Sequence, residues 1–369
     1  MVLELGKTVR RDVSTPLFRV ALIAFLVHQI LHAAVVFLHG DAPYFFCQYD
    51  CNWYVGIVEF GYMPEANGNA GGSRPESDVA NWAFFPLFPI ISGTVHWLTG
   101  IAPQVAVILS SKVLWLLAVC AFLAFQRQYL PEAPLWLGAA VLVLNPAAIY
   151  ANTGYTEPLF LMIACLSLTA MRQDRPILAG MMGALLSAAR AVGVGIGLPF
   201  AAYALSQVLR QSDAKAGRLL FAGMLIPLGL AAYMIFLHFH VGDAMAFSHI
   251  QRAWDRELSS PLYHLSKGLR GSPYTFIMAL TALIGAALAG YLAWKGEGGL
   301  ALFLLFATAI PLATGTSSLG RYVMMQPAFL LAVVMLMHDH RLLRALLVPS
   351  ALSYLWMSYA WQESLFFVI

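Results

Sequence analysis

Long apolar runs separated by short polar segments make up most of this chain of 369 residues. The sequence is 60% hydrophobic and only 11% charged, whereas soluble globular domains have roughly 45–50% apolar and about 25% charged residues. A helix needs about 20 apolar residues to cross the hydrocarbon core of a bilayer. We therefore expect an all-α polytopic membrane protein that forms one integral-membrane domain over residues 1–369.

The orientation of the apolar runs follows from lysine and arginine, which favour cytoplasmic loops. Lys7, Arg10 and Arg11 place the N-terminus in the cytoplasm, and the acidic loop 39–82, with the lone Arg74, lies outside. The first run is expected to act as an uncleaved signal anchor. The runs cover residues 17–38, 84–98, 103–124, 134–150, 157–171, 177–208, 219–239, 273–294, 299–313, 321–337 and 342–361.

Two of these runs must be treated differently if the remaining basic loops are to lie inside. The run 84–98 is short and contains Pro86 and Pro89, which suits a re-entrant or surface-lying helix. The run 177–208 must cross twice, as two short helices that meet near Arg190. This threading predicts about eleven spans, with a first outer loop region at 39–102 and a second outer loop at 240–272.

Under this threading the polar clusters meet at the outer face. Asp50 lies in an aromatic segment just beyond the first run, and Glu157 directly precedes Pro158. Arg190 interrupts an apolar run, and Arg321 opens one from the outer side. Because separate segments bring these charges to one side, we expect one extracytoplasmic active site.

The carboxylates have both functional and ordinary interpretations. Asp50 can act as a general base that takes a proton from an acceptor hydroxyl, or it can cap a helix or lie as a charge in the interface. Glu59 is a weaker candidate for the same chemistry. Glu157 is explained by the helix dipole or by hydroxyl binding in a sugar pocket.

The two arginines are candidates for binding a lipid phosphate, because a guanidinium makes forked hydrogen bonds to phosphate oxygens. An unpaired arginine within a span costs at least about 2.5–3.5 kcal/mol, which favours a site role for Arg190. Arg321 binds phosphate or reaches toward lipid headgroups.

Two loops carry further candidates. Phe247, Ile250 and Trp254 recur at helical spacing, which indicates an amphipathic interfacial helix. His249 and Gln251 on that helix contact substrate, or the helix simply lies on the membrane. The segment 63–80 is rich in Gly, Asn, Ser and Pro, so it is an inert connector or a lid over the site.

Metal, nucleic-acid and disulfide signals are weak. No metal-ligand spacing or phosphate-binding loop occurs, and no basic patch suggests nucleic acid. Cys120 and Cys165 fall in apolar runs and are expected to be packing residues. Cys47 and Cys51 can form a disulfide only if their segment is not helical, because helical residues four apart hold their Cβ atoms about 6 Å apart, against about 3.8 Å in a disulfide.

Taken in order, several short motifs resemble the PIG-V family, which includes a mannosyltransferase of glycosylphosphatidylinositol anchor synthesis and its bacterial relatives. The motifs extend over most of the chain. They are Tyr49-Asp50 with Gly61-Tyr62, Trp82-Ala83-Phe84-Phe85-Pro86 with Pro89, Asn145-Pro146-Ala147 with Tyr155-Thr156-Glu157, Ala189-Arg190 with Gly193, Gly242-Asp243 with Ala246-Phe247, Gln251 and Trp254, and Gly320-Arg321-Tyr322.

This resemblance implies a membrane glycosyltransferase of the GT-C fold. If the chain is a bacterial relative of the family, we expect it in the inner membrane. Such an enzyme transfers a hexose, typically mannose, from a polyprenyl-phosphate donor to a lipid or glycan acceptor with inversion. It implies that Asp50 is the base, and the chemistry of the guanidinium group leads us to expect that Arg190 and Arg321 bind the donor phosphate. The residues expected to contact sugar or acceptor are Trp53, Glu59, Trp82, Phe85, Tyr155, Glu157, His249, Gln251, Trp254 and Tyr322. We expect no metal and no other cofactor. The alternative is a flippase or transporter of lipid-linked sugars, which needs the cavity and the arginines but no base.

Overall fold

A computed structural model describes residues 14–39, 47–66, 79–209, 213–254, 256 and 258–365. Over these residues the protein is built from helices, and no β-sheet is formed. The predicted all-α class is thus confirmed. The possible lid at 63–80 lies mostly outside the described residues.

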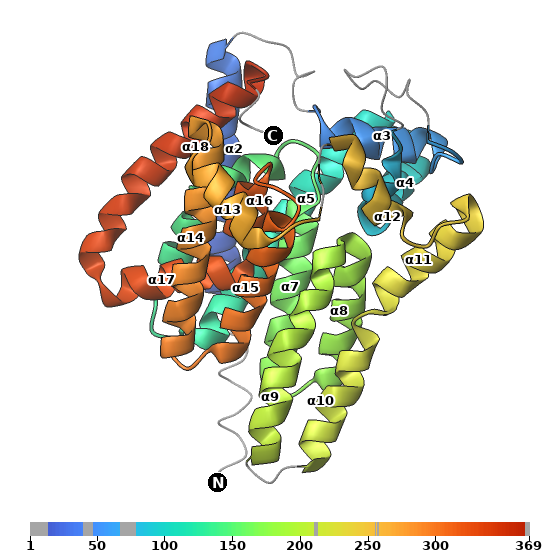
Figure 1. Ribbon diagram of the computed structural model, residues 1–369. Coiled ribbons are helices and arrows are strands. Elements are labelled where there is room, and N and C mark those ends of the chain that lie inside the picture. Colours follow the sequence, from blue (N-terminus) through green and yellow to red (C-terminus); the bar gives the residue numbers. More distant parts are fainter. Residues whose placement is uncertain are drawn as a thin grey trace.

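The helices follow one another closely along the chain (Figure 1). The first half contains α2 (Ser14–His39), α3 (Asp50–Phe60), η2 (Asn81–Ala83), α4 (Leu87–Thr99), α5 (Pro103–Tyr129), α6 (Leu135–Val143), η3 (Pro146–Ala151), α7 (Glu157–Arg172), α8 (Pro176–Ala189), η4 (Ala191–Ile196) and α9 (Gly197–Leu209). The second half contains α10 (Asp213–Leu225), α11 (Leu228–Val241), α12 (Ala246–His249), η5 (Ile250–Trp254), α13 (Pro261–Leu269), α14 (Pro273–Trp294), α15 (Gly298–Leu312), α16 (Leu319–Met324), α17 (Pro327–Asp339), η6 (Arg341–Leu346) and α18 (Leu347–Gln362).

Proline sets the start of many of these helices. Pro103, Pro158, Pro176, Pro273 and Pro327 each occupy one of the first two positions of a helix. A proline there loses no helical hydrogen bond, because the first N–H groups of a helix have no partner within it, and its fixed φ suits the helix. The short loops of this chain therefore give way abruptly to new helices.

Helix α5 forms the centre of the core. It packs against α2, α4, α6 and α7, and its side chains Trp115, Phe122 and Phe125 are fully buried. The outer faces of the bundle are apolar instead of charged, with exposed side chains such as Phe37 and Ile235. A buried centre and an apolar exterior are what a helix bundle in lipid requires.

Five helical segments of the described chain are long and apolar enough to cross a membrane. They are Pro16–His39, Pro103–Tyr129, Ala191–Leu209, Lys215–Val241 and Pro273–Trp294. The predicted count of about eleven spans is not confirmed. Several predicted runs form shorter helices, such as α6, α8 and α17. A short helix in the interior of a bundle is as apolar as a membrane span, so hydropathy does not distinguish the two.

The two unusual runs form one broken and one short helical segment. Helix α8 ends at Ala189 and η4 begins at Ala191, so the run 177–208 does break at Arg190. Helix α4 has 13 residues, and at 1.5 Å per residue it extends only about 20 Å, which is shorter than the hydrocarbon core of about 30 Å.

One end of the bundle collects the polar segments. Helices α3, α4, α12 and α16 all lie toward the upper end in Figure 1, whereas α9 and α10 extend to the opposite end. The start of α7 and the junction between α8 and η4 also face this upper end. The fold therefore brings the carboxylates and arginines singled out in the sequence to one place.

Candidate active site

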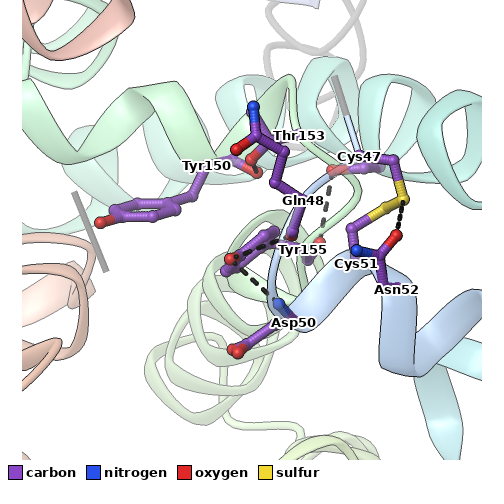
Figure 2. Close-up of a disulfide and its surroundings, with 9 residues drawn as sticks. Cys47, Gln48, Asp50, Cys51, Asn52, Tyr150, Thr153 and Tyr155 are labelled. Carbon is purple, nitrogen blue, oxygen red and sulfur yellow. Dashed lines mark hydrogen bonds between the residues drawn. A yellow bond between two sulfur atoms is a disulfide. The ribbon is translucent and has the colours of Figure 1, made fainter. Parts of the chain in front are cut away.

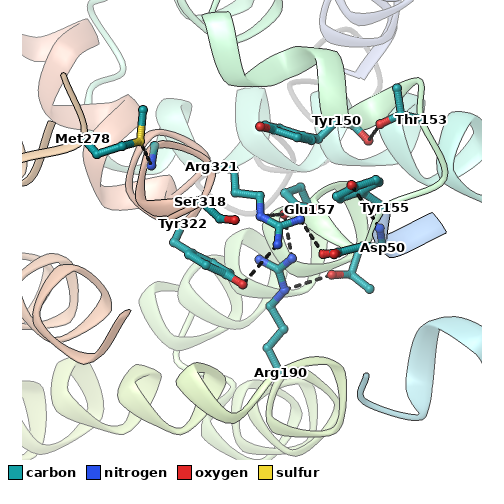
Figure 3. A network of polar contacts seen from close by, with 12 residues as sticks. Asp50, Tyr150, Thr153, Tyr155, Glu157, Arg190, Met278, Ser318, Arg321 and Tyr322 are labelled. Carbon is teal, nitrogen blue, oxygen red and sulfur yellow. Dashed lines mark hydrogen bonds and ion pairs between the residues drawn. The ribbon is translucent and has the colours of Figure 1, made fainter. Parts of the chain in front are cut away.

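Four charged side chains from four separate segments meet in one cluster (Figure 3). Arg321 Nη1 lies 2.6 Å from Asp50 Oδ2, and its Nε lies 3.7 Å from Glu157 Oε1. Arg190 Nη2 lies 2.6 Å from the same Glu157 oxygen. The two guanidinium groups thus approach one another from opposite sides, with Glu157 between them and Asp50 at the edge.

Burial of this cluster increases from Asp50 inward. The Asp50 side chain is 22% exposed and that of Arg190 15%, whereas Arg321 and Glu157 are only 4% and 1% exposed. Buried charges are tolerated only when they are paired. Here each buried charge faces an opposite one, and Asp50 is the carboxylate most accessible to a substrate.

The carboxylates both begin helices. Asp50 is the first residue of α3 and Glu157 is the first residue of α7. The N-terminal end of a helix carries a partial positive charge and free N–H groups, which favour an anion there. Both side chains therefore lie where a helix N-terminus and an arginine supply compensating positive charge.

Arg190 is placed by a tight turn. It ends α8 in an extended conformation, and its Nε donates to Thr156 Oγ1 at 2.9 Å. Gly193 follows in η4, where a Cβ atom would lie 2.4 Å from the carbonyl oxygen of Leu186. Only glycine allows this close approach, so the chain can turn back directly after Arg190.

Three tyrosine rings surround the Arg321 guanidinium. Its Cζ atom lies 5.6 Å from the ring centre of Tyr150, 5.1 Å from that of Tyr155 and 5.0 Å from that of Tyr322. The Tyr322 ring also faces Arg190, at 4.9 Å. Such cation–π contacts stabilise a buried guanidinium without neutralising it.

The Tyr322 hydroxyl is unusually acidic. Burial alone would raise its pKa above the ordinary value of 10.0. The positive charges of Arg321, Arg256 and Arg190 more than offset burial and lower the pKa of Tyr322 to about 8. This shift shows that the positive charges dominate the electrostatics on this side of the cluster.

Arg256 is a third arginine that the sequence did not single out. Its Nη2 donates to Ser318 Oγ at 3.2 Å, and Ser318 directly precedes the helix α16 that carries Arg321. Among the described residues Arg256 makes no ion pair with a carboxylate. Among the described side chains, three arginines therefore face two carboxylates, an excess of positive charge.

Aromatic side chains line the approach to Asp50. Trp53, three residues further along α3, stacks on Phe84 with ring centres 5.6 Å apart. Trp254 packs edge-on against both rings, at 5.8 Å from Trp53 and 6.0 Å from Phe84. Residues three apart on a helix share a face, so this aromatic wall stands beside the carboxylate.

A hollow of about 220 Å³ opens near this wall. Trp82 lines it together with Asp243, His249 and Arg252. His249 Nδ1 lies 2.7 Å from Asp243 Oδ2, and this hydrogen bond lowers the pKa of Asp243. The hollow is open to the surface, and both polar and apolar side chains line it.

The other predicted contact residues lie away from the four charges. Glu59 is exposed near the far end of α3, about 13 Å from Asp50 along the helix at 1.5 Å per residue. Phe85 is buried against Tyr233 and Phe247. Gln251 is half-buried in η5 next to the hollow.

Two loop contacts that support the site were missing from the sequence predictions. Asn145 begins η3, where its side chain accepts from the Ala147 N–H and donates to the Met324 carbonyl at 2.9 Å. Asn152 Oδ1 accepts from Gln29 Nε2 at 2.8 Å and from Lys112 Nζ at 3.3 Å. These bonds attach the loop that carries Tyr155 and Glu157 to α16, α2 and α5. In the sequence, the only sign of these contacts was the presence of asparagines in the loop.

The expectation for Cys47 and Cys51 depended on where the helix begins. Helix α3 begins at Asp50, so Cys47 lies outside it and the two cysteines form a disulfide (Figure 2). Cys120 and Cys165 are free cysteines, as expected. Over the described residues no group of three His, Cys, Asp or Glu side chains is arranged to hold a metal ion.

Comparisons with known proteins give limited similarity. No family model matches the sequence, and no curated protein matches it. Among solved structures, the archaeal oligosaccharyltransferase AglB from Archaeoglobus fulgidus, in complex with an inhibitory peptide and a dolichol-phosphate, is 12% identical with a TM-score of 0.48. The match covers 93% of this chain and 55% of that one.

The apo form of the same enzyme matches at 11% identity and a TM-score of 0.48, over 94% of this chain and 55% of that one. The form tethered to an acceptor peptide matches at 11% identity and a TM-score of 0.47. This chain thus spans about half the length of the structures it resembles. Similarity at this level assigns neither a family nor an activity to the protein.

Proposed function

We propose that this protein is a membrane glycosyltransferase of the GT-C type that transfers a hexose from a polyprenyl-phosphate donor to a hydroxyl of a lipid or glycan acceptor. The observation that carries the proposal is the contact between Arg321 and Asp50, a buried arginine beside an accessible carboxylate. Phosphate binding and proton abstraction are the two tasks of such a transfer, and the cluster holds the groups for both within a few ångströms. The PIG-V resemblance makes mannose the first sugar to test.

The donor phosphate binds at the arginines. Arg190 and Arg321 present guanidinium groups from two directions, which suits forked hydrogen bonds to phosphate oxygens. Arg256 adds the charge that the two carboxylates leave uncompensated. The same three groups stabilise the negative charge that grows on the phosphate as it leaves.

Donor binding also frees the base. Asp50 is paired with Arg321, so an arriving phosphate competes with Asp50 for the same guanidinium. Once displaced, the carboxylate accepts the proton of the acceptor hydroxyl. The acceptor oxygen forms a bond to the anomeric carbon, the carbon–phosphate-oxygen bond breaks with its electron pair moving to the phosphate, and the anomeric configuration inverts.

The aromatic wall and the hollow serve the sugar and the acceptor. Trp53 and Trp254 offer flat faces beside Asp50, and Trp82, His249 and Gln251 lie around the hollow next to them. The polyprenyl chain lies along the apolar surface of the bundle, where burial contributes about 25 cal/mol per Å². In this proposal the site lies on the extracytoplasmic side of a bacterial inner membrane, and transfer needs no metal.

Transfer by purified protein in detergent tests this function. The donors are polyprenyl-phosphate mannose and its glucose counterpart, each with labelled sugar, and a membrane lipid extract supplies the acceptors. Label that moves to a new lipid or glycan, with full activity in EDTA, supports the proposal. Label that stays on the polyprenyl phosphate in detergent but crosses the bilayer of sealed vesicles would establish a flippase and refute the transferase.

A further inference from the structure

A disulfide encloses the candidate base. Cys47 and Cys51 are bonded across Gln48, Tyr49 and Asp50, so Asp50 is part of a small covalent ring at the start of α3. We propose that this disulfide is a positioning element that fixes the backbone of Asp50 beside Arg321, so that the carboxylate released by the donor phosphate is correctly placed as base only in the oxidised protein. The inference rests on the proposed function in assigning Asp50 its role.

The backbone inside the ring is strained. Tyr49 has a φ of 51° and a ψ of −114°, a combination that residues other than glycine rarely adopt. Such conformations persist only where the surroundings impose them, and they gather at functional sites. The covalent ring is the constraint closest to Tyr49 along the chain.

The ring is seated on the loop that precedes α7. A Cβ atom at Gly154, where φ is +74°, would lie 2.5 Å from Cys51 Sγ and 3.0 Å from Val107 Cγ1. The glycine therefore makes room for the disulfide sulfur. Cys51 and Cys47 are 0% and 6% exposed, which leaves little space around either sulfur.

Tyr155, the next residue of that loop, makes hydrogen bonds to the same turn. The backbone N–H of Asp50 donates to Tyr155 Oη at 3.3 Å, and this hydroxyl lies 3.5 Å from the Gln48 carbonyl oxygen, to which it donates. Figure 2 shows the disulfide on one side of the turn and the Asp50 carboxylate pointing away from it. The disulfide thus fixes the turn from behind, and Tyr155 fixes the backbone of Asp50 itself.

Reduction of the disulfide would move the turn that carries Asp50. Two thiols cannot remain as close as two bonded sulfurs, so the sulfurs must separate. Cys51 is held in α3 and is fully buried beside Gly154, so Cys47, which lies outside the helix, moves and the strained turn relaxes. Because the carboxylate of Asp50 projects from that turn, its contact with Arg321 loosens.

The rest of the protein does not depend on the disulfide. Gln48 Nε2 donates to the Trp361 carbonyl at 3.1 Å, and Tyr49 Oη donates to the Ser364 carbonyl at 3.1 Å. These bonds keep the turn attached to the end of α18 after reduction. Loss of the disulfide is therefore expected to lower turnover and to leave the bundle folded.

The test compares the double variant Cys47→Ser/Cys51→Ser with wild type in the detergent assay. We expect kcat to fall at least about tenfold while donor affinity stays within about twofold, because Arg190 and Arg256 are unaffected. The matched control, Cys120→Ser/Cys165→Ser, should keep wild-type kcat and should lose it on reduction as wild type does. Equal kcat in the double variant and in wild type would overturn the inference.

Two further measurements use the wild-type protein. Reduction with a phosphine should lower kcat, and reoxidation should restore it, which decides the matter if the double variant does not fold. Hydrogen exchange should increase at the amides of Asp50, Cys51 and Asn52 on reduction. If wild type shows no transfer, the proposed function fails, and unchanged exchange at these amides would refute the positioning role separately.

Discussion

Arg321 Nη1 and Asp50 Oδ2 lie 2.6 Å apart. Under the proposed function, the residue that binds the donor phosphate therefore holds the residue that acts as base. A donor phosphate that takes over this guanidinium would release the carboxylate. The ion pair thus predicts an order of events in which donor binding comes first and proton transfer second.

Replacement of Arg321 should weaken donor binding. We expect Arg321→Ala to raise the donor Kd about 10–100-fold, because hydrogen bonds to charged groups contribute about 1.5–3 kcal/mol. The donor Kd of Arg321→Lys should lie between those of wild type and Arg321→Ala, since lysine keeps the charge and loses the forked geometry. Titration with a fluorescent polyprenyl phosphate measures this, with the exposed Arg341→Ala as control. An unchanged Kd in Arg321→Ala would assign this arginine a structural role.

Arg256 should separate binding from stability. It makes no ion pair among the described residues, so Arg256→Ala leaves none of the described carboxylates without a partner. We expect the donor Kd to rise about 5–20-fold, for the loss of about 1–2 kcal/mol, and the melting temperature to stay within about 2 °C of wild type. Calorimetry together with the same titration measures both. A variant that melts early and binds normally would contradict this role.

Glu157 should act through the arginines instead of acting as a base. It is almost fully buried between Arg190 and Arg321, and removing one partner of a buried ion pair costs about 3–5 kcal/mol. Glu157→Gln should therefore lower the free energy of unfolding by about that amount. The exposed Glu59→Gln is the matched control and should leave stability unchanged. Wild-type stability in Glu157→Gln would show that the cluster is more hydrated than its geometry indicates.

Tyr322 should make donor binding depend on alkaline pH. Its hydroxyl is neutral below its pKa of about 8 and negative above it. Ionisation cancels the surplus positive charge of the site, so donor affinity should fall as the pH rises through about 8. Tyr322→Phe should bind the donor equally at pH 7 and pH 9. Affinity of wild type that does not change over this range would contradict the assignment.

The predictable part of the site follows from the cost of placing charge in lipid. Arg190 and Asp50 were conspicuous because charge is expensive in or beside apolar segments, and the loop charges put both on one face. The direct contact between Arg321 and Asp50 was not predictable, because hydropathy gives the side of the membrane and no distances. Arg256 lies in a polar loop where an arginine is unremarkable, so only its position near Tyr322 reveals it.

The span count and the disulfide could not be decided from the sequence for a related reason. The interior helices α6 and α17 are as apolar as lipid-facing ones, so hydropathy cannot separate a buried short helix from a span. The pairing of Cys47 with Cys51 depends on α3 beginning at Asp50. Helix boundaries predicted from sequence shift by a few residues, which is enough to reverse that conclusion.

The account depends most directly on Asp50. In the detergent assay with labelled polyprenyl-phosphate sugar, Asp50→Asn should lower turnover by about 10²–10⁴-fold, the usual contribution of a general base. Its affinity for the donor should be equal to that of wild type or higher, because asparagine no longer competes with the phosphate for Arg321. Turnover at the wild-type rate in Asp50→Asn would contradict the account.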